Sequence, residues 1–339
     1  MEKIQFGKTG LMVSRIALGG IPIMRVPKED AIKLVREALE LGINFIDTAN
    51  GYADSEEKIG EGISGMKRED LIITSKSMAN DKKTFNEHLD LSLKRLKLDY
   101  IDIYQFHNVG SAEKRDAIFG HGGAFEGLQE AIKAGKVRFP GFSSHNLEIT
   151  LELMKRNIFA AVQFPFNYVD NAAEKEIIPL AKELDIGFIS MKPMGGGLLD
   201  NAGLSFRYLL QFDHIIPDPG IEKPEELREI VRIVKEKQLL TADDKKAIEK
   251  LRAELDSVWC HRCDYCQPCP QGISISSVLS AKSLYKRFTL ERFKSLSGAA
   301  LEKARTCLEC NQCKPRCPYH LDIPRLLKEN LAMWDKIKG

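Results

Sequence analysis

The sequence predicts an α/β fold, namely a (β/α)8 TIM barrel followed by a small, mostly helical C-terminal domain. Short apolar runs alternate eight times with longer amphipathic stretches over about the first 240 residues, a pattern typical of this barrel. All eight cysteines lie between residues 260 and 317, so the end of the chain has a composition of its own. A chain of 339 residues is long enough to bury one large core and one small one.

The expected elements of the barrel follow one another in a regular order. Segments 3–6 and 11–15 come first and predict a hairpin turned through glycines. The eight expected strands are the apolar runs at 16–20, 43–49, 71–76, 101–107, 137–144, 160–167, 186–193 and 214–220. Apolar residues three and four apart predict helices between these runs, among them 29–42, 84–98, 124–135, 147–156, 174–185 and 224–237. A doubly wound sheet is the alternative, but the segment LGGIPIM supplies its glycine-rich phosphate turn poorly.

The charge balance indicates what the protein does not bind. The chain has 50 lysines and arginines against 48 aspartates and glutamates, so no overall field attracts nucleic acid or a membrane surface. The N-terminal segment MEKIQFGKTG lacks an apolar core, and no window approaches the roughly 18 apolar residues of a membrane span. We therefore expect a cytoplasmic protein with no nucleic-acid or membrane partner.

A second domain is expected after residue 256, giving a barrel domain over 1–256 and a cysteine-rich domain over 257–339. Within the second domain an internal repeat is visible, because the segment 269–279 is echoed by the segment 317–327. Each copy begins with Cys-Pro and continues into an apolar-periodic, helical pattern. In a reducing compartment such clustered cysteines are more often metal ligands than disulfides.

The spacing of the cysteines predicts two iron-sulfur clusters. The second run, followed by Pro318, matches C-x2-C-x2-C-x3-C-P, and the first differs from it by one residue at the last gap. This run is typical of bacterial ferredoxins, in which the fourth cysteine ligates the other [4Fe-4S] cluster. We expect cluster 1 on Cys260, Cys263, Cys266 and Cys317, and cluster 2 on Cys307, Cys310, Cys313 and Cys269. Two zinc sites of four thiolates each are the alternative.

Polar residues stand where the expected barrel strands end, which is where barrel enzymes carry their active sites. Strand two ends in Asp47 and leads to Tyr52, strand three ends in Lys76, and strand four ends in His107. This set resembles the catalytic tetrad of the aldo-keto reductase family. The resemblance covers about residues 1–236 and is supported by the motifs DSEEKIGEGI, SSHN and VQFPFN.

The chemistry of carbonyl reduction gives each of the four residues a role. A tyrosine with a pKa near 10 is a weak acid at neutral pH, but a neighbouring ammonium favours its phenolate. We therefore expect Tyr52 to act as the general acid, Lys76 to activate it, Asp47 to hold Lys76, and His107 to orient the carbonyl oxygen. Taken singly, each residue also has a plain structural explanation as a cap, an ion pair or a packing residue.

The resemblance also implies a bound nicotinamide cofactor, NADP or NAD. Ser143, Ser144 and Gln163 match positions that bind the carboxamide, and Met191 stands where the family often has a stacking aromatic ring. The other positions implied as cofactor contacts are Gly20, Asp47, Lys192, Pro193, Gly197, Gly220 and Lys223. Glu222 falls where a basic residue commonly meets the 2′-phosphate, so the choice between NADP and NAD stays open.

Three functions are compatible with these features. The first is a nicotinamide-dependent enzyme that interconverts a small-molecule carbonyl and an alcohol, with clusters in a structural or sensory role. The second couples the barrel to a redox partner protein through the clusters and needs a flavin or another one-electron intermediate. The third is a redox or iron sensor. The substrate is expected to meet the loop at 107–123, in which His121 reads as an exposed polar residue.

Overall fold

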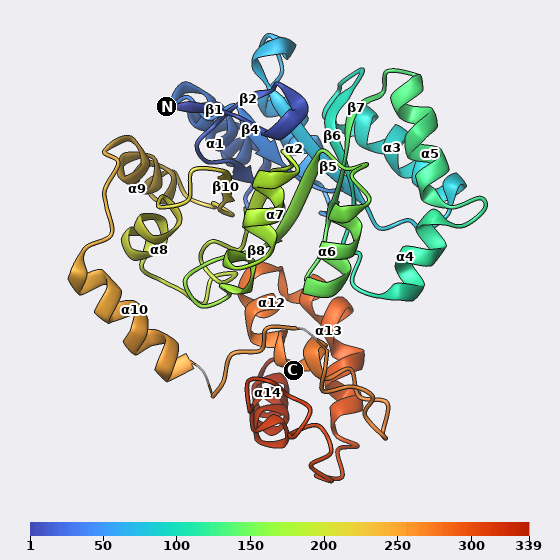
Figure 1. The fold of residues 1–339 in the computed structure, drawn as a ribbon, viewed down its shortest axis with the longest axis vertical. Coiled ribbons are helices and arrows are strands. Elements are labelled where there is room, and N and C mark those ends of the chain that lie inside the picture. The colour runs from blue at the N-terminus through green and yellow to red at the C-terminus, as the bar shows by residue number, and fades with distance from the viewer. Residues whose placement is uncertain (256, 263, 339) are drawn as a thin grey trace. The chain divides into compact units, whose positions relative to one another are not determined.

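The computed structural model describes residues 1–255, 257–262 and 264–338, so Cys263 lies outside the described residues. The chain forms two compact units (Figure 1). The barrel unit consists of Met1–Met194 and Asn201–Leu240, and the cysteine unit consists of Gly195–Asp200 and Thr241–Gly339. The break in contacts after Leu240 precedes the change in composition near residue 257, and helix α10 (Ala242–Leu255) lies between the two positions.

The barrel unit is built on a parallel sheet of eight strands, as the sequence predicts. The sheet order is β10-β9-β8-β7-β6-β5-β4-β3, and a parallel bridge between Gly19 and Gly220 links its two ends. The strands are β3 (Leu18–Gly19), β4 (Phe45–Asp47), β5 (Ile72–Ser77), β6 (Ile101–Phe106), β7 (Val137–Ser143), β8 (Ala161–Pro165), β9 (Gly187–Met191) and β10 (Ile215–Asp218). Each strand lies within one of the eight expected apolar runs except for the last residue of β5, Ser77. Because all strands run the same way, their carboxyl ends meet at one end of the barrel.

The N-terminal hairpin supports the opposite end of the barrel. Strands β1 (Lys3–Gln5) and β2 (Met12–Ser14) pair antiparallel around the short helix η1 (Gly7–Thr9). Gly10 ends this turn with a φ of 69°, a left-handed conformation that glycine adopts without strain. Apolar residues of the hairpin and of the barrel interior form one buried cluster: Phe6, Leu11, Val13, Ala17, Phe45, Ile72, Ile103, Ala161, Ile189 and Ile216. Because the hairpin packs at the opposite end of the barrel, it does not cover the carboxyl ends of the strands, where a site can form.

Helices connect the strands of the barrel unit. They are α1 (Lys28–Glu40), α2 (Ser55–Gly62), α3 (Lys82–Leu96), α4 (Ala112–Phe119), α5 (Ala124–Lys133), α6 (Leu147–Lys155), α7 (Ile177–Glu183), α8 (Ala202–Leu209) and α9 (Pro224–Lys235). Three short 3-10 helices, η2 (Pro22–Arg25), η3 (Arg68–Asp70) and η4 (Ala172–Glu174), lie in the connections. Side chains of Asp81, Ser111 and Asn146 cap the first turns of α3, α4 and α6 by accepting backbone amides.

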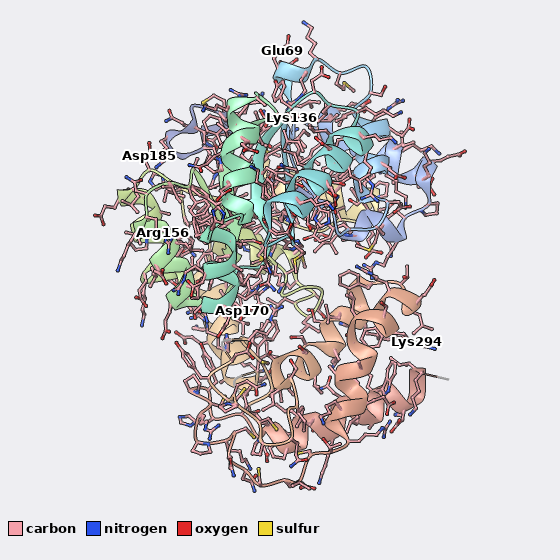
Figure 2. The ribbon with its side chains drawn as sticks, turned by 90° about the vertical axis from the view of Figure 1, so that its right-hand side faces the viewer. Glu69, Lys136, Arg156, Asp170, Asp185 and Lys294 are labelled. Atoms are coloured by element: carbon pink, nitrogen blue, oxygen red, sulfur yellow. The ribbon has the colours of Figure 1, made fainter. Side chains whose placement is uncertain are left out.

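Charged side chains of both signs lie on the outside of the barrel unit. Glu69, Lys136 and Asp185 are exposed there (Figure 2). Lys136 pairs with Asp90 at 2.7 Å. In the part of the chain that the structure describes, no helix combines the length and the apolar character needed to cross a membrane.

The cysteine unit is mostly helical, as predicted. Besides α10 it contains α11 (Ile275–Leu279), α12 (Ala281–Arg287), α13 (Leu290–Ala304) and α14 (Ile323–Ile337). The internal repeat explains its core, because Ile275 and Val278 of the first copy and Ile323 and Leu326 of the second are all buried in one cluster. Trp334 also packs in this cluster, and its Nε1 donates a hydrogen bond to Glu302 Oε1 at 2.6 Å. The two Cys-Pro segments therefore lead into helices that share a core.

Candidate active site and cysteine sites

The four residues of the expected tetrad lie at the carboxyl ends of neighbouring barrel strands. Asp47 is the last residue of β4, Lys76 lies near the end of β5, and His107 directly follows β6. Tyr52 lies in the connection between β4 and α2. Strands β4, β5 and β6 are hydrogen-bonded in sequence, so the parallel register alone brings these residues to one place.

Lys76 and Asp47 form a buried ion pair. The Lys76 Nζ lies 2.5 Å from Asp47 Oδ2 and donates a second hydrogen bond to the carbonyl of Thr48 at 2.7 Å. Both side chains are almost fully buried, with 1% and 2% of their residues' surface exposed. Burial acts to lower the pKa of Lys76, but the carboxylate of Asp47, helped by Tyr52 and Asp218, outweighs burial and raises this pKa. Lys76 is therefore a fixed ammonium at neutral pH.

Tyr52 and His107 face each other beside this ammonium. The Lys76 Nζ lies 5.2 Å from the centre of the Tyr52 ring, and the rings of Tyr52 and His107 meet edge to face with their centres 5.6 Å apart. Burial, followed by the ammonium groups of Lys76, Lys114 and Lys192, lowers the pKa of His107 well below its ordinary value. His107 is thus a neutral imidazole at pH 7, and its buried Nδ1 has no hydrogen-bond partner among the described residues.

A second carboxyl group, which sequence reasoning missed, lies beside the ion pair. Asp218 ends β10 and is buried, and Gln163 Nε2 donates to its Oδ2 at 3.1 Å and to Asp47 Oδ2 at 3.4 Å. Burial and then the charge of Asp47 raise the pKa of Asp218 well above its ordinary value, although Lys76 partly opposes them. Asp218 is therefore a weaker acid than an ordinary aspartate. The signal was present in the sequence, since an acidic residue interrupts the apolar run HIIPDPG.

Polar groups that could hold a nicotinamide carboxamide line the ends of β7 and β8. Gln163 is buried, and its Oε1 has no partner within the described part of the chain. The Ser143 hydroxyl accepts the amide of Asn108 at 2.9 Å, which leaves its own hydrogen for a ligand. The Ser144 hydroxyl is more fully engaged, because it donates to the carbonyl of Val109 at 2.7 Å and accepts the amide of Asn146 at 3.0 Å.

Of the remaining positions implied as cofactor contacts, all but Gly197 belong to the barrel unit. Met191 ends β9 and is followed by Lys192, whose Nζ lies 2.7 Å from His145 Nε2, and by buried Pro193. Gly20 donates its amide to the carbonyl of Asp47 at 2.7 Å, and a Cβ there would meet that oxygen. Gly197 belongs to the cysteine unit, where its carbonyl accepts Lys286 Nζ at 3.0 Å.

The segment after β10 carries a pocket with charges of both signs. Arg25, Asp30, Lys33, Glu222 and Lys223 line it, together with Val26, Pro27 and Pro224. Glu222 forms an ion pair with Arg25, which sequence reasoning did not single out because the two residues are far apart in the chain. Gly220 approaches Pro22 so closely that a Cβ would meet the proline ring at 2.6 Å. His121, in the loop between α4 and α5, is fully exposed, and its Nδ1 lies 3.8 Å from Glu126 Oε1.

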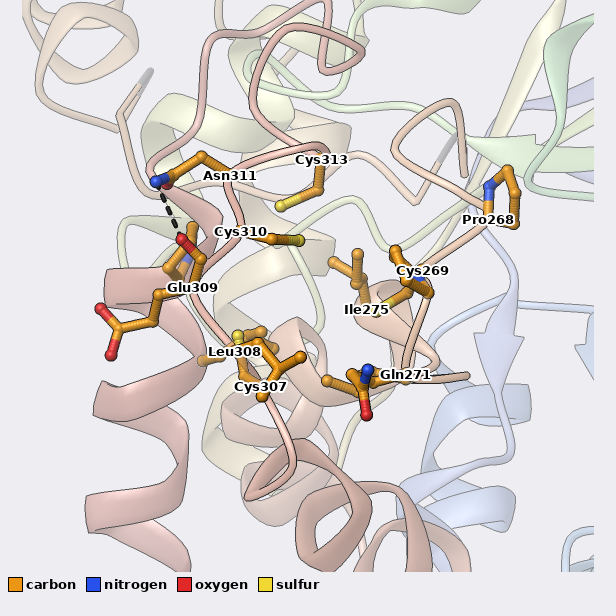
Figure 3. Close-up of a pocket in the computed structure, with 14 residues that line it drawn as sticks. Pro268, Cys269, Gln271, Ile275, Cys307, Leu308, Glu309, Cys310, Asn311 and Cys313 are labelled. Carbon is orange, nitrogen blue, oxygen red and sulfur yellow. Dashed lines mark hydrogen bonds between the residues drawn. The ribbon is translucent and has the colours of Figure 1, made fainter.

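In the cysteine unit, four thiols from both cysteine runs line one pocket. Cys269 comes from the first run and Cys307, Cys310 and Cys313 from the second (Figure 3). Apolar side chains such as Ile275 and Leu327 form much of the remaining wall. Burial raises the pKa of Cys313, and the neighbouring thiols of Cys307, Cys310 and Cys269 raise it further. Four crowded thiolates need a cationic group between them, so this donor set fits an iron-sulfur cluster.

The other cysteines are described in part. Cys266 and Cys317 are buried in the core of the unit and Cys260 packs against it, whereas Cys263 lies outside the described residues. The described cysteines are all free thiols. Within 1–255, 257–262 and 264–338, no group of three or more His, Cys, Asp or Glu side chains gathers closely enough to hold a single metal ion.

Comparison with known proteins agrees with this division of the chain. Residues 15–205 match the model of the aldo/keto reductase family, and residues 259–322 match that of a 4Fe-4S dicluster domain. The first match spans more than half of the chain. The chain belongs to the aldo/keto reductase family. It is an oxidoreductase of this family that carries a 4Fe-4S dicluster domain after its barrel.

Individual relatives cover the barrel. An L-galactose dehydrogenase from Arabidopsis thaliana is 32% identical over 225 residues, which is 60% of this chain and 69% of that protein. The uncharacterized oxidoreductase YrpG from Bacillus subtilis is 31% identical over 233 residues, 60% of this chain and 70% of that protein. Among solved structures, the holo form of an aldo-keto reductase from Bacillus halodurans superposes with a TM-score of 0.63 and 25% identity, covering 74% of this chain and 96% of that one.

Proposed function

We propose that this reductase interconverts a small-molecule carbonyl and an alcohol by hydride transfer with NADP or NAD, and that Tyr52 is its general acid and base. The observation that carries the proposal is the Asp47–Lys76 ion pair, whose Nζ lies 5.2 Å from the centre of the Tyr52 ring. A fixed ammonium beside a phenol stabilises the phenolate, which lowers the barrier for proton donation. The nicotinamide, when bound, supplies the hydride.

The protein's own residues handle the proton and the carbonyl oxygen. In reduction, the hydroxyl of Tyr52 donates its proton to the oxygen as the C–O bond becomes single, and the phenolate left behind is held by Lys76. His107 is neutral, so it donates one N–H hydrogen bond to the same oxygen without competing as an acid. In the direction of alcohol oxidation the phenolate takes the proton back.

Two groups of residues are proposed to hold the cofactor. Gln163 and Ser143 would bind the carboxamide, because each keeps an unused hydrogen-bonding atom beside the tetrad. Lys223 and Arg25 would meet the phosphate end of the molecule in the pocket after β10. Glu222 neutralises Arg25 there, which favours a ribose hydroxyl over a 2′-phosphate and therefore NAD over NADP.

For the cysteine unit we propose crossed ligation of two [4Fe-4S] clusters. The support is that Cys269 lines a pocket with Cys307, Cys310 and Cys313, which the described cysteines of its own run, Cys260 and Cys266, do not line. Cys260, Cys263, Cys266 and Cys317 would then hold the other cluster. The clusters, when bound, supply one-electron redox chemistry. Exposure of Cys310 and of Leu308, which is 71% exposed, favours exchange of electrons with a partner protein as their second role.

The experiment that tests the catalytic proposal compares two matched tyrosine variants. Tyr52→Phe removes the proposed acid, whereas Tyr100→Phe removes a hydroxyl just before β6, at the opposite end of the strand. We expect Tyr52→Phe to lower kcat for carbonyl reduction with NADH or NADPH by about 10²–10⁴-fold and Tyr100→Phe to leave it within twofold. Equal turnover by wild type and Tyr52→Phe would overturn the proposal.

The cluster proposal has separate readouts. An anaerobic sample should contain about eight iron atoms per chain and absorb broadly near about 400 nm. Zinc in place of iron would show that the thiols hold the alternative metal. Addition of a reduced redox partner or a flavin mediator should change the EPR signal of the clusters, and an unchanged signal would argue for a purely structural role.

A further inference from the structure

A lysine beside the tetrad, Lys114, forms no salt bridge with a carboxylate of the described residues. Lys114 lies in the first turn of α4, and its Nζ donates to the backbone carbonyl of His107 at 2.7 Å. The ammonium therefore lies at the end of β6, next to the imidazole that is expected to orient the carbonyl oxygen. It is close enough to His107 to help lower the pKa of that imidazole.

Two buried lysines of the barrel unit each have an aspartate as partner. Lys76 pairs with Asp47 at 2.5 Å, and Lys58 pairs with Asp54 at 2.9 Å while donating to three carbonyls. Lys114 is half-buried, yet in the described ranges of the chain no acidic side chain forms a salt bridge with it. Of the two acidic residues nearest to it along the chain, Asp116 pairs with Arg115, and Glu113 forms no salt bridge with Lys114 in the described structure.

The absence of a carboxylate partner at a half-buried position is unfavourable for an ammonium. Desolvation favours the neutral amine, and burial accordingly lowers the pKa of Lys114 to about 8. An anion that arrives at this position restores the interaction that the protein does not supply. Lys192, with its Nζ beside His145, adds a second positive charge facing His107.

The order of the strands separates the substrate side of the site from the cofactor side. Apart from Gly20 and Asp47, the residues expected to contact the cofactor lie on or after β7, β8, β9 and β10, and Lys192 is one of them. Lys114 follows β6, on the side of the sheet order that leads to β5 and β4 and thus to Lys76 and Tyr52. A carbonyl compound that reaches Tyr52 and His107 would therefore extend past Lys114.

We propose that the substrate is an anionic carbonyl compound and that the ammonium of Lys114 binds its carboxylate or phosphate beside His107. This inference rests on the proposed carbonyl reduction and names the class of its substrate. Lys114 binds substrate and takes no part in the transfer of the hydride or the proton. The carbonyl of His107 holds the ammonium in place, so the charge is positioned before the substrate arrives.

The test uses pairs of substrates that differ in charge. Succinate semialdehyde is compared with butanal, and glyceraldehyde 3-phosphate with glyceraldehyde, each with NADH and NADPH. We expect the wild-type protein to prefer at least one anion over its neutral partner in kcat/KM, and the pair that shows the preference distinguishes carboxylate from phosphate. Lys114→Gln should raise KM for that anion about tenfold, the size of one charge-assisted hydrogen bond, and leave the neutral partner within twofold.

Two further variants distinguish charge from structure. Lys114→Arg keeps the charge and should retain most of the preference, whereas Lys155→Gln removes an exposed lysine at the far end of α6 and should change nothing. Equal losses for the anion and its neutral partner in Lys114→Gln would show that the lysine only supports the end of β6, and would overturn the inference. No preference in the wild type would overturn it as well.

Failure of the proposed carbonyl reduction gives a different experimental result from failure of the anion site. If no aldehyde is reduced with either nicotinamide, the proposed reaction fails, and the anion site is then judged by calorimetric titration with succinate and with inorganic phosphate, neither of which can be reduced. Binding to wild type that weakens in Lys114→Gln would support the site, and no binding to wild type would overturn it.

Discussion

In the barrel unit Asp47 and Lys76 are buried, pair with each other and lie at the ends of regular strands, whereas in the cysteine unit the described thiols lie on loops between helices and that of Cys310 is exposed. Lys76 has Asp47, and Gln163 bridges Asp47 and Asp218. Cys313, by contrast, lies beside the thiols of Cys307, Cys310 and Cys269, which raise its pKa in addition to burial. The charge of Lys76 is thus balanced within the barrel unit, whereas the crowded thiols of the cysteine unit depend on a group that they bind.

The strongest test of this comparison removes one of the two crossing cysteines. Under crossed ligation Cys269→Ser and Cys317→Ser each disturb segments from both runs, so either variant should lose at least half of its iron and destabilise the whole unit. Structural metal sites contribute on the order of 10 kcal/mol to folding, so loss of the unit's helical signal is expected. Iron analysis and circular dichroism of each variant measure this.

The barrel should behave as an independent unit in the same experiment. Tyr52→Phe is the reciprocal control, because it should keep its iron and its melting curve while losing turnover. Cysteine variants that keep full iron, or whose barrel unfolds together with the cysteine unit, would contradict the comparison.

The next effect concerns the buried ion pair. Asp47→Asn leaves the ammonium of Lys76 buried without its charged partner, which should cost about 3–5 kcal/mol of unfolding free energy. The exposed pair Lys82–Glu130 has a similar separation of 2.6 Å, and Glu130→Gln should cost about 0–1 kcal/mol. Urea unfolding of both variants gives the difference, and equal costs would show that burial of the tetrad pair has no energetic consequence.

The raised pKa of Asp218 predicts a smaller effect, in which this carboxyl group stabilises the fold more at low pH than at high pH. Its pKa is raised in the folded protein, so its contribution to stability is greatest below the unfolded pKa near about 4 and declines by up to about 1.4 kcal/mol per pH unit until the raised pKa is reached. Asp218→Asn removes this decline. Its melting temperature relative to wild type should therefore rise between pH 5 and pH 8.

The matched control is Asp116→Asn, at an exposed carboxylate whose pKa is lowered by Arg115. Asp116 is ionised in both the folded and unfolded states over this range, so its variant should show no trend between pH 5 and pH 8. A flat difference for Asp218→Asn would mean that Asp218 is ionised in the folded protein.

The smallest predicted effect is the pH dependence of Lys114. Its pKa of about 8 means that the ammonium loses its proton as the pH rises through this value. The ratio of KM for succinate semialdehyde to KM for butanal should rise above pH 8 and approach the ratio of Lys114→Gln. Taking the ratio cancels the effects of pH on the steps that both substrates share. A ratio that stays constant from pH 6 to pH 10 would contradict a charge-based role for Lys114.

Much of the fold could be predicted from the sequence because one physical signal, the alternation of apolar runs with amphipathic stretches, marks every strand of the barrel. The tetrad followed from the same signal, since parallel strands bring their carboxyl ends together whatever the details of the loops. Helix α4 was missed because Ile118 is its only buried residue, so it has no apolar stripe to recognise.

The groups that sequence reasoning missed depend on contacts between distant segments. The Arg25–Glu222 ion pair and the Gln163–Asp218 hydrogen bond join residues that no local pattern relates. Lys114 reaches the carbonyl of His107 only because the loop after β6 turns back over the strand end. Such contacts depend on the closure of the barrel, and the periodicity of apolar residues in the sequence does not reveal them.

The most direct test of the central claim, that the barrel transfers a hydride through its own tetrad, is to follow deuterium from the C4 position of a labelled nicotinamide. Wild-type protein and an aldehyde that it reduces should give an alcohol with one deuterium per molecule, delivered from one face of the nicotinamide ring only. An alcohol without deuterium, formed while the clusters change their redox state, would contradict the account and assign the electrons to the cysteine unit.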